Sequence, residues 1–106
     1  MSLSTHVLDA VSGRPATGVA VTLTDAAGTT LATGVTDGDG RIARLGDGLA
    51  AGVHRLHFDT ASYFRASGTP AFYPEIVIAF EITDPAGKYH VPVLLSPYAY
   101  STYRGS

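Results

Sequence analysis

Residues 88–106 read KYHVPVLLSPYAYSTYRGS and predict a hairpin of two strands that ends where the chain ends. Because side chains alternate between the two faces of a strand, the first strand can be divided by parity. One of its faces carries the residues of a hydrophobic core, Tyr89, Val91, Val93 and Leu95. The opposite face combines His90 with Pro92 and Leu94, a mixture typical of neither a core nor an ordinary solvent-exposed surface. This second face is therefore predicted to lie in a subunit interface or a groove.

The chain ends in Tyr103-Arg104-Gly105-Ser106, which brings together a phenol, a guanidinium, a hydroxyl and the α-carboxylate. Chain termini usually fray unless other contacts hold them. Composition alone leaves two interpretations open, a solvated tail or part of a site. Tyr103 and Gly105 share a strand face with Ser101, a mixture that again suggests an interface or a groove. We interpret the tail as part of a site.

Strand patterns also dominate the rest of the chain. Short alternating or β-branched segments are separated by turn residues at Leu3–Ala10, Val19–Thr24, Thr30–Thr36, Arg41–Leu45, Gly52–Asp59 and Glu75–Thr83. One helix is predicted over Asp59–Gly68, with Asp59 or Thr60 as its cap and Gly68 at its end. About eight strands at this spacing predict an all-β sandwich that forms a single domain over residues 1–106.

The composition narrows the classes of partner and chemistry. Of the 106 residues, 45% are hydrophobic and only 15% are charged, against roughly 25% charged in typical domains, so other subunits are expected to cover part of the surface. The net charge of −2 argues against nucleic acids and anionic membranes as partners. The absence of cysteine excludes disulfides and thiol catalysis. The first residues contain neither a basic segment nor a long apolar run, which predicts a cytoplasmic protein.

Two patterns resemble metal sites, and neither predicts one. His54 and His57 have an odd separation in a predicted strand, so their side chains point to opposite faces, and no cysteine is available to complete a zinc site. Asp37–Gly40 resembles part of a calcium loop, but Gly48 stands where the closing glutamate would be required. We expect a tight turn there.

Other candidate residues lie on strand faces. His6 shares a face with Leu8 and Ala10, as His90 does with apolar residues on its own strand. Arg41 and Arg44 lie on opposite faces of a short predicted strand. Their spacing does not decide which of the two points toward a site.

Motifs along the whole chain resemble those of the transthyretin-related 5-hydroxyisourate hydrolases. They are THVLD at 5–9, DGR at 39–41, FYPE at 72–75, YHVP at 89–92, LSP at 95–97 and YRGS at 103–106. The terminal tetrapeptide is the motif that separates these hydrolases from the hormone-carrying transthyretins. Lys88 is a departure, because many family members have a histidine at this position.

The resemblance implies a fold, an assembly and a reaction. The fold is a transthyretin-like β-sandwich of two sheets with one short helix, assembled as a homotetramer that is a dimer of dimers. The substrate sites lie in the channel between the dimers. The implied reaction is the hydrolysis of 5-hydroxyisourate, the unstable product of urate oxidation, to 2-oxo-4-hydroxy-4-carboxy-5-ureidoimidazoline, with no cofactor or metal.

The resemblance also implies roles for individual residues. It assigns catalysis to His6, Arg41, His90 and Ser106, and substrate binding to Tyr103, Arg104 and Gly105. One imidazole would activate water, and the other would orient that water or protonate the leaving nitrogen. Arg41 and Arg104 could bind carbonyl or enolate oxygens. Ser106 would position the substrate through its hydroxyl or fix the tail through its carboxylate.

Two other classes of function are compatible with a sandwich of this kind. A carrier would hold an aromatic hormone in the same channel, but the histidines, Arg41 and the terminal Arg104-Gly105-Ser106 would make that channel polar and closed. A structural or adhesion sandwich would tolerate the loss of Tyr103–Ser106 and leaves the histidines on the second face unexplained. We expect the hydrolase.

Overall fold

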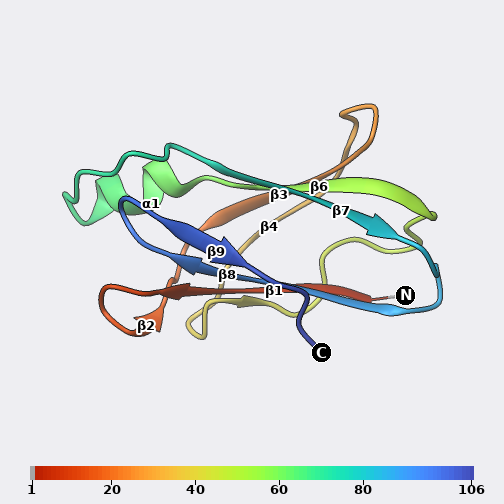
Figure 1. The fold of residues 1–106 in the computed structure, drawn as a ribbon, viewed down its shortest axis with the longest axis horizontal. Helices are drawn as coiled ribbons and strands as arrows, with labels where there is room; N and C mark the ends of the chain where they lie inside the picture. Colours follow the sequence, from red (N-terminus) through yellow and green to blue (C-terminus); the bar gives the residue numbers. More distant parts are fainter. Residues whose placement is uncertain (1) are drawn as a thin grey trace.

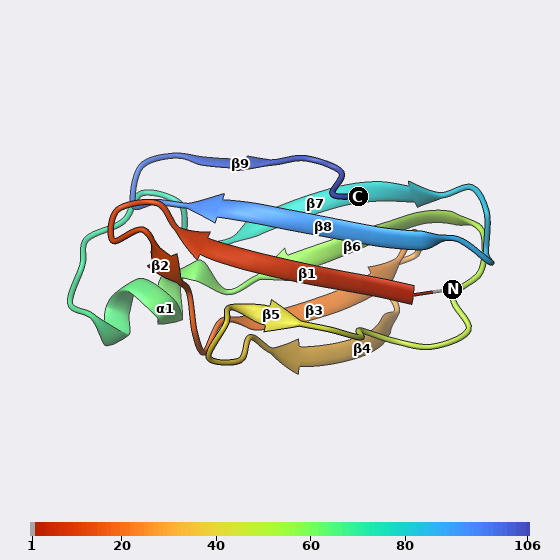
Figure 2. The same cartoon turned by 90° about the horizontal axis from the view of Figure 1, so that it is seen from below.

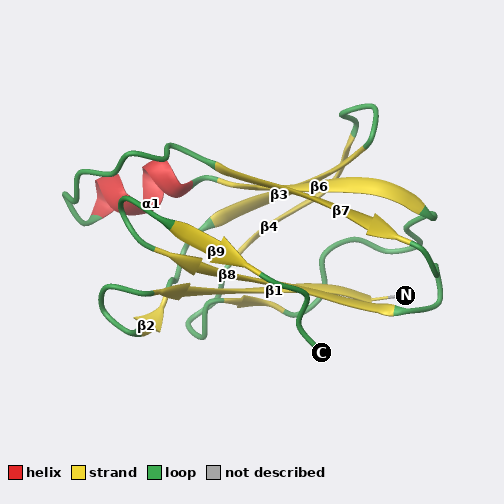
Figure 3. Cartoon of the chain, viewed as in Figure 1, coloured by secondary structure: helices red, strands yellow, loops and turns green. Residues whose placement is uncertain are grey.

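The structure is a computed structural model that describes residues 2–106 as two β-sheets packed face to face, with a short helix at one end (Figures 1 and 3). The first sheet has the strand order β2-β1-β8-β9, with β5 paired to β1. Its strands are β1 (Ser2–Asp9), β2 (Arg14–Pro15), β5 (Arg41–Ile42), β8 (Lys88–Leu95) and β9 (Tyr100–Thr102). The second sheet has the order β4-β3-β6-β7. Its strands are β3 (Ala20–Asp25), β4 (Thr30–Val35), β6 (Gly52–Phe58) and β7 (Ile76–Ile82).

The core lies between the inner faces of the two sheets. In β8, Tyr89, Val91, Val93 and Leu95 are all buried, as their parity predicted. Their neighbours from β1 are Leu3, Thr5 and Val7, which are also buried. The second sheet contributes fully buried side chains that include Leu23, Leu56, Phe58, Ile76 and Ile82. With these residues inside, the alternate residues of β1 and β8 must point outward from the first sheet.

Strands β1 and β8 are parallel and pair along all of their length, from Ser2 opposite Lys88 to Asp9 opposite Leu95. This register pairs the first strand of the chain with one of its last. Each inward residue of β1 lies opposite an inward residue of β8, and each outward residue opposite an outward one. The outward residues of β1 therefore lie beside the outward residues of β8. A slip of one residue would turn every one of these side chains to the other face.

The helix predicted over Asp59–Gly68 is confirmed and is α1 (Thr60–Ala66). The carboxylate of Asp59 caps it by accepting a hydrogen bond from the backbone N–H of Ser62 at 3.1 Å. Gly68 follows with a positive φ of 67°, the conformation in which glycine commonly ends a helix. No helix within residues 2–106 is long and apolar enough to cross a membrane.

Three elements differ from the prediction, and the described residues contain nine strands instead of about eight. The two-residue strand β2 pairs with the end of β1 and lies between the predicted strand segments Leu3–Ala10 and Val19–Thr24. Strand β5 stops at Ile42, because the chain then turns Leu45 into the core, where its N–H donates to the carbonyl of Leu3. Strand β9 ends at Thr102 rather than at the chain end, and only one further bridge, at Gly105, continues the pairing.

Candidate active site

The outward face of the first sheet gathers three of the predicted site residues. In the β1–β5 pairing, His6 lies opposite Arg41. In the β1–β8 pairing, Ser4 lies opposite His90, one outward position away from His6. Figure 2 shows β5, β1 and β8 side by side on this surface. Residues far apart in the sequence are thus brought together by strand register alone.

A cavity of about 350 Å³ opens on this face next to His90. Its polar lining comes from β1, β5, β8 and the end of the chain, and consists chiefly of Ser2, Ser4, Arg41, Lys88, His90 and Ser106. A smaller hollow of about 160 Å³ is lined by His6, Leu8, Pro92, Leu94 and Tyr103. Two cationic side chains and one imidazole in a single cavity favour a ligand with negative charge or several carbonyl oxygens.

The turn before β5 fixes the position of Arg41. The Asp37 carboxylate accepts hydrogen bonds from the backbone N–H groups of Asp39 at 2.9 Å and Arg41 at 3.0 Å. These bonds, led by the one from Arg41, lower the pKa of Asp37. Gly40 has a φ of 73°, and a Cβ there would overlap the carbonyl oxygen of Val7. The segment is therefore a tight turn, as predicted, and it delivers Arg41 beside His6.

The C-terminal tail lies against His90. The backbone N–H of Gly105 donates to the carbonyl of His90 at 2.9 Å. A Cβ on Gly105 would overlap Cδ2 of the His90 imidazole, so only glycine lets the tail approach the ring this closely. Ser106 follows directly and lines the cavity. The tail is thus attached to the site rather than being a free terminus.

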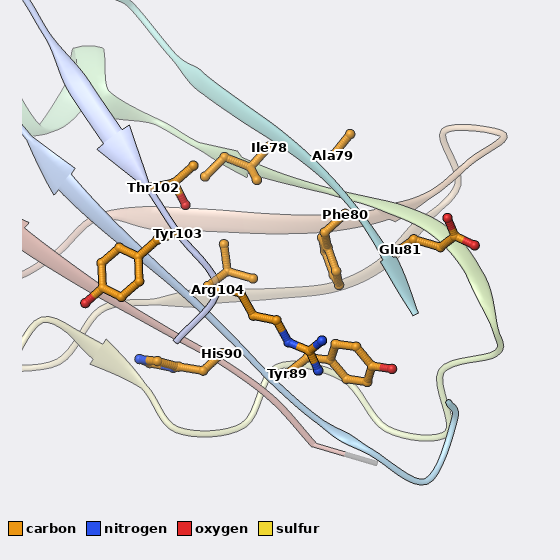
Figure 4. Close-up of a pocket in the computed structure, with 10 residues that line it drawn as sticks. Ile78, Ala79, Phe80, Glu81, Tyr89, His90, Thr102, Tyr103 and Arg104 are labelled. Carbon is orange, nitrogen blue, oxygen red and sulfur yellow. The ribbon is translucent and has the colours of Figure 1, made fainter. Parts of the chain in front are cut away.

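The side chain of Arg104 extends away from this cavity. Its guanidinium stacks over the ring of Tyr89 at 4.9 Å from the ring centroid, and Nη2 donates to the carbonyl of Lys88 at 3.4 Å (Figure 4). Arg104 therefore joins the tail to β8, and it lines a second pocket with Phe80, which His90 and Tyr103 also line (Figure 4). Substrate binding by Arg104 stays a prediction.

The environment of His90 favours the neutral imidazole. Burial lowers its pKa most, the nearby guanidinium of Arg41 and imidazole of His6 lower it further, and a hydrogen bond to the backbone of Ser4 acts in the opposite direction. The result is a pKa below the usual value of about 6.5. A neutral imidazole at pH 7 can accept a proton, which suits a general base.

The remaining histidines lie outside this site. His54 is buried between the sheets and donates through Nδ1 to the carbonyl of Gly52 at 3.1 Å. His57 is on the opposite face of β6, as predicted, 3.2 Å from the carboxylate of Glu75. Residues 2–106 contain no cluster of three or more histidine or acidic side chains arranged to hold a metal ion.

The two candidate arginines differ in position. Arg44 forms an exposed ion pair with Asp47 at 3.0 Å, whereas Arg41 lines the cavity. Sequence reasoning missed Ser4, whose Oγ lies 2.7 Å from Nδ1 of His90. Its spacing of two from His6 was the available signal, because that spacing places both residues on one strand face.

The structure is thus a β-sandwich of two sheets with a polar cavity on the outer face of one of them. Known proteins with similar sequences and structures share this fold. The 5-hydroxyisourate hydrolase of Salmonella dublin is 49% identical over 98% of this chain and 80% of its own length. The structure of Klebsiella pneumoniae 5-hydroxyisourate hydrolase matches with a TM-score of 0.93 at 41% identity and covers 100% of both chains. Sea bream transthyretin in complex with thyroxine matches with a TM-score of 0.91 at 37% identity, over 99% of this chain and 95% of its own.

The HIUase/Transthyretin family model matches residues 3–105. The chain belongs to this family, and its two-sheet fold with one short helix is the transthyretin-like sandwich.

Proposed function

We propose that this protein hydrolyses 5-hydroxyisourate to 2-oxo-4-hydroxy-4-carboxy-5-ureidoimidazoline. The observation that carries the proposal is the gathering of His6, Arg41, His90 and Ser106 on one outer sheet face. The names of relatives such as the Salmonella dublin protein, at 49% identity, support the same substrate.

The proposed reaction begins with water in the cavity. A neutral imidazole, from His90 or His6, takes a proton from the water as its oxygen bonds to the ring carbonyl carbon. The carbonyl electron pair moves onto its oxygen. When the carbonyl re-forms and the carbon–nitrogen bond breaks, the leaving nitrogen takes the proton that the first imidazole received from water, either directly or relayed through the second imidazole. The base is then neutral again, and the proton and the hydroxyl of one water molecule are both in the product.

Arg41 is proposed to stabilise the negative oxygen. No carboxylate lies within ion-pair distance of its guanidinium among residues 2–106. Its donors are therefore available for a carbonyl or enolate oxygen, and a planar guanidinium offers two of them in parallel. Charge that develops on the substrate oxygen during attack would bind Arg41 more tightly than the ground state does. Ser106 is proposed to position the substrate from the end of the tail.

We further propose that the site lies in a channel between subunits of a homotetramer built as a dimer of dimers. The outward face places the partly buried apolar side chains of Leu8 and Leu94 beside the polar cavity, and a second subunit would cover them. Sedimentation at low concentration tests this assembly. A stable monomer with full activity would contradict the interface channel. The predicted cytoplasmic location can be tested by cell fractionation.

The alternative is a carrier, since sea bream transthyretin in complex with thyroxine has the same fold. The imidazole and arginine in the cavity favour hydrolysis over the binding of an apolar aromatic ring. The deciding experiment uses 5-hydroxyisourate generated in place from urate and urate oxidase, with its ultraviolet decay followed over time. We expect fast decay with the full chain and the spontaneous rate with a truncation that lacks Tyr103–Ser106. If the well-folded full chain gives no acceleration, the hydrolase proposal fails and aromatic-ligand binding should be measured next.

A further inference from the structure

The imidazole of His90 has a hydrogen-bond partner that the proposed reaction leaves unused. Ser4 lies directly opposite His90 in the parallel pairing of β1 with β8, and its Oγ is 2.7 Å from Nδ1 of the ring. Both side chains are half-buried and line the same cavity. Because the contact is made between two paired strands, its geometry is set by the sheet rather than by a mobile loop.

A base role for His90 decides which atom of this contact donates. A serine hydroxyl can donate or accept, so the 2.7 Å distance alone does not assign the hydrogen. If Oγ donated to Nδ1, the neutral ring would carry its hydrogen on Nε2, and neither nitrogen could take a proton from water. With hydrogen on Nδ1, Oγ of Ser4 accepts and the lone pair of Nε2 stays available.

We propose that Ser4 is a positioning residue that accepts a hydrogen bond from Nδ1–H of His90 and thereby holds Nε2 as the unprotonated, basic nitrogen. This inference rests on the proposed hydrolase function, and it assigns the base role to His90. His6 is then left to orient the water or to protonate the leaving nitrogen.

Gly105 blocks the alternative orientation of the ring. Its backbone packs against Cδ2, the ring atom that a 180° flip would exchange with Nδ1. A flipped ring would lose the bond to Ser4 and place a polar nitrogen against the tail. Ser4 on one edge and Gly105 on the other thus leave one orientation, in which only Nε2 is free to accept a proton.

The bond to Ser4 also survives the reaction. When a water proton moves to Nε2, the water oxygen bonds to the substrate carbon and His90 becomes an imidazolium with hydrogen on both nitrogens. Nδ1–H still donates to Oγ of Ser4, more strongly because the ring is now charged. Ser4 therefore stabilises the protonated base without any rearrangement, as a group that orients a catalytic histidine does.

Kinetics on three variants test the role. In Ser4→Ala we expect kcat to fall roughly 10- to 100-fold, which is part of the 10²–10⁴ contributed by a positioned general base, with KM within about twofold of wild type. Ser4→Thr keeps a hydroxyl and suits a strand, so it should restore kcat to within about threefold. Thr33→Ala also removes a hydroxyl, at an exposed position on β4 in the other sheet, and should have no effect. Wild-type kcat in Ser4→Ala, or an equal loss in Ser4→Thr, would overturn the assignment.

A measurement without substrate separates this inference from the proposed function. Two-bond ¹⁵N–¹H correlation spectra distinguish the two neutral tautomers of histidine. For His90 we expect hydrogen on Nδ1 in wild type and Ser4→Thr, and a shift toward the Nε2–H form in Ser4→Ala. Hydrogen on Nε2 in the wild type would refute the role of Ser4 even if the enzyme is active. Failure of the wild type to accelerate decay would refute the hydrolase function, whatever the tautomer.

Discussion

Replacing Gly105 by alanine would test how closely the tail must approach His90. The glycine φ is not in the left-handed region, so alanine meets no backbone strain at this position. The obstacle is purely one of space, because the new Cβ would overlap Cδ2 of the imidazole and lie 3.1 Å from its Cγ. Either the ring turns or the tail moves away from β8.

The size of the effect follows from the required movement. Ordinary van der Waals contact begins near 3.4 Å, so the ring or the tail must shift by on the order of 1 Å, and a displacement of that size typically costs about 100-fold in rate. The folding cost is much smaller. If the tail moves, the hydrogen bond from Gly105 to the carbonyl of His90 is lost, and if the ring turns, its bond to Ser4 is lost; a bond of this kind contributes about 1 kcal/mol. We therefore expect a large loss of kcat/KM in a protein of nearly unchanged stability.

The assay is the ultraviolet decay of 5-hydroxyisourate, measured beside urea denaturation of each variant. Gly38→Ala is the matched control, because Gly38 has no neighbour within 4 Å of a new Cβ and no positive φ. It should retain wild-type activity. Wild-type kcat/KM in Gly105→Ala would show that the approach of the tail to His90 does not matter for catalysis, and the site described above would need a different geometry.

Three further predictions concern charge, hydrogen bonding and the core. Burial lowers the pKa of His90 most, and Arg41 and His6 lower it further, so the neutral base is retained to a lower pH than for an ordinary histidine. In Arg41→Met, an NMR titration should find the pKa of His90 higher than in the wild type, and an unchanged pKa would contradict the coupling. Burial and Asp9 raise the pKa of Tyr63 to about 12, and its hydroxyl donates a hydrogen bond to the carboxylate of Asp9. Tyr63→Phe removes this bond and should lower the free energy of unfolding, measured by urea denaturation, by about 1 kcal/mol with activity unchanged. Lost activity would link this end of the sandwich to catalysis. Leu56→Ala leaves a cavity at a fully buried position between the sheets and should lower the free energy of unfolding by about 2–5 kcal/mol. A loss under about 1 kcal/mol would indicate that neighbouring side chains repack to fill the cavity.

Local patterns were sufficient for most of the fold. The alternation in β8 identified its buried face correctly, and Asp59 with Gly68 bounded the helix. The exceptions are elements held by contacts with distant residues. Strand β2 contains only Arg14 and Pro15, too short for any periodicity, and exists because it lies against the end of β1. The end of β9 could not be read from residues 100–106, because the tail continues as an isolated bridge to His90.

The candidate site divides in the same way. Parity placed His6 and His90 on outward faces, and the structure brings both faces together. Parity could not choose between Arg41 and Arg44. Residues three apart in a strand lie on opposite faces, and parity does not say which of the two faces carries the site. The choice came from the resemblance at residues 39–41, and the turn held by Asp37 supplies its physical reason.

The contact between Ser4 and His90 was beyond any local pattern, because it depends on the register of two strands separated by most of the chain. With a register shifted by one residue, Ser4 would face the core and Nδ1 of His90 would lose its partner. The parallel pairing of β1 with β8 thus does more than close the first sheet. It selects which outward side chains meet, places His6 and His90 on one sheet face, and sets the hydroxyl of Ser4 2.7 Å from Nδ1 of His90. The same hydrogen-bonded ladder that stabilises the fold therefore sets the chemistry of the proposed site.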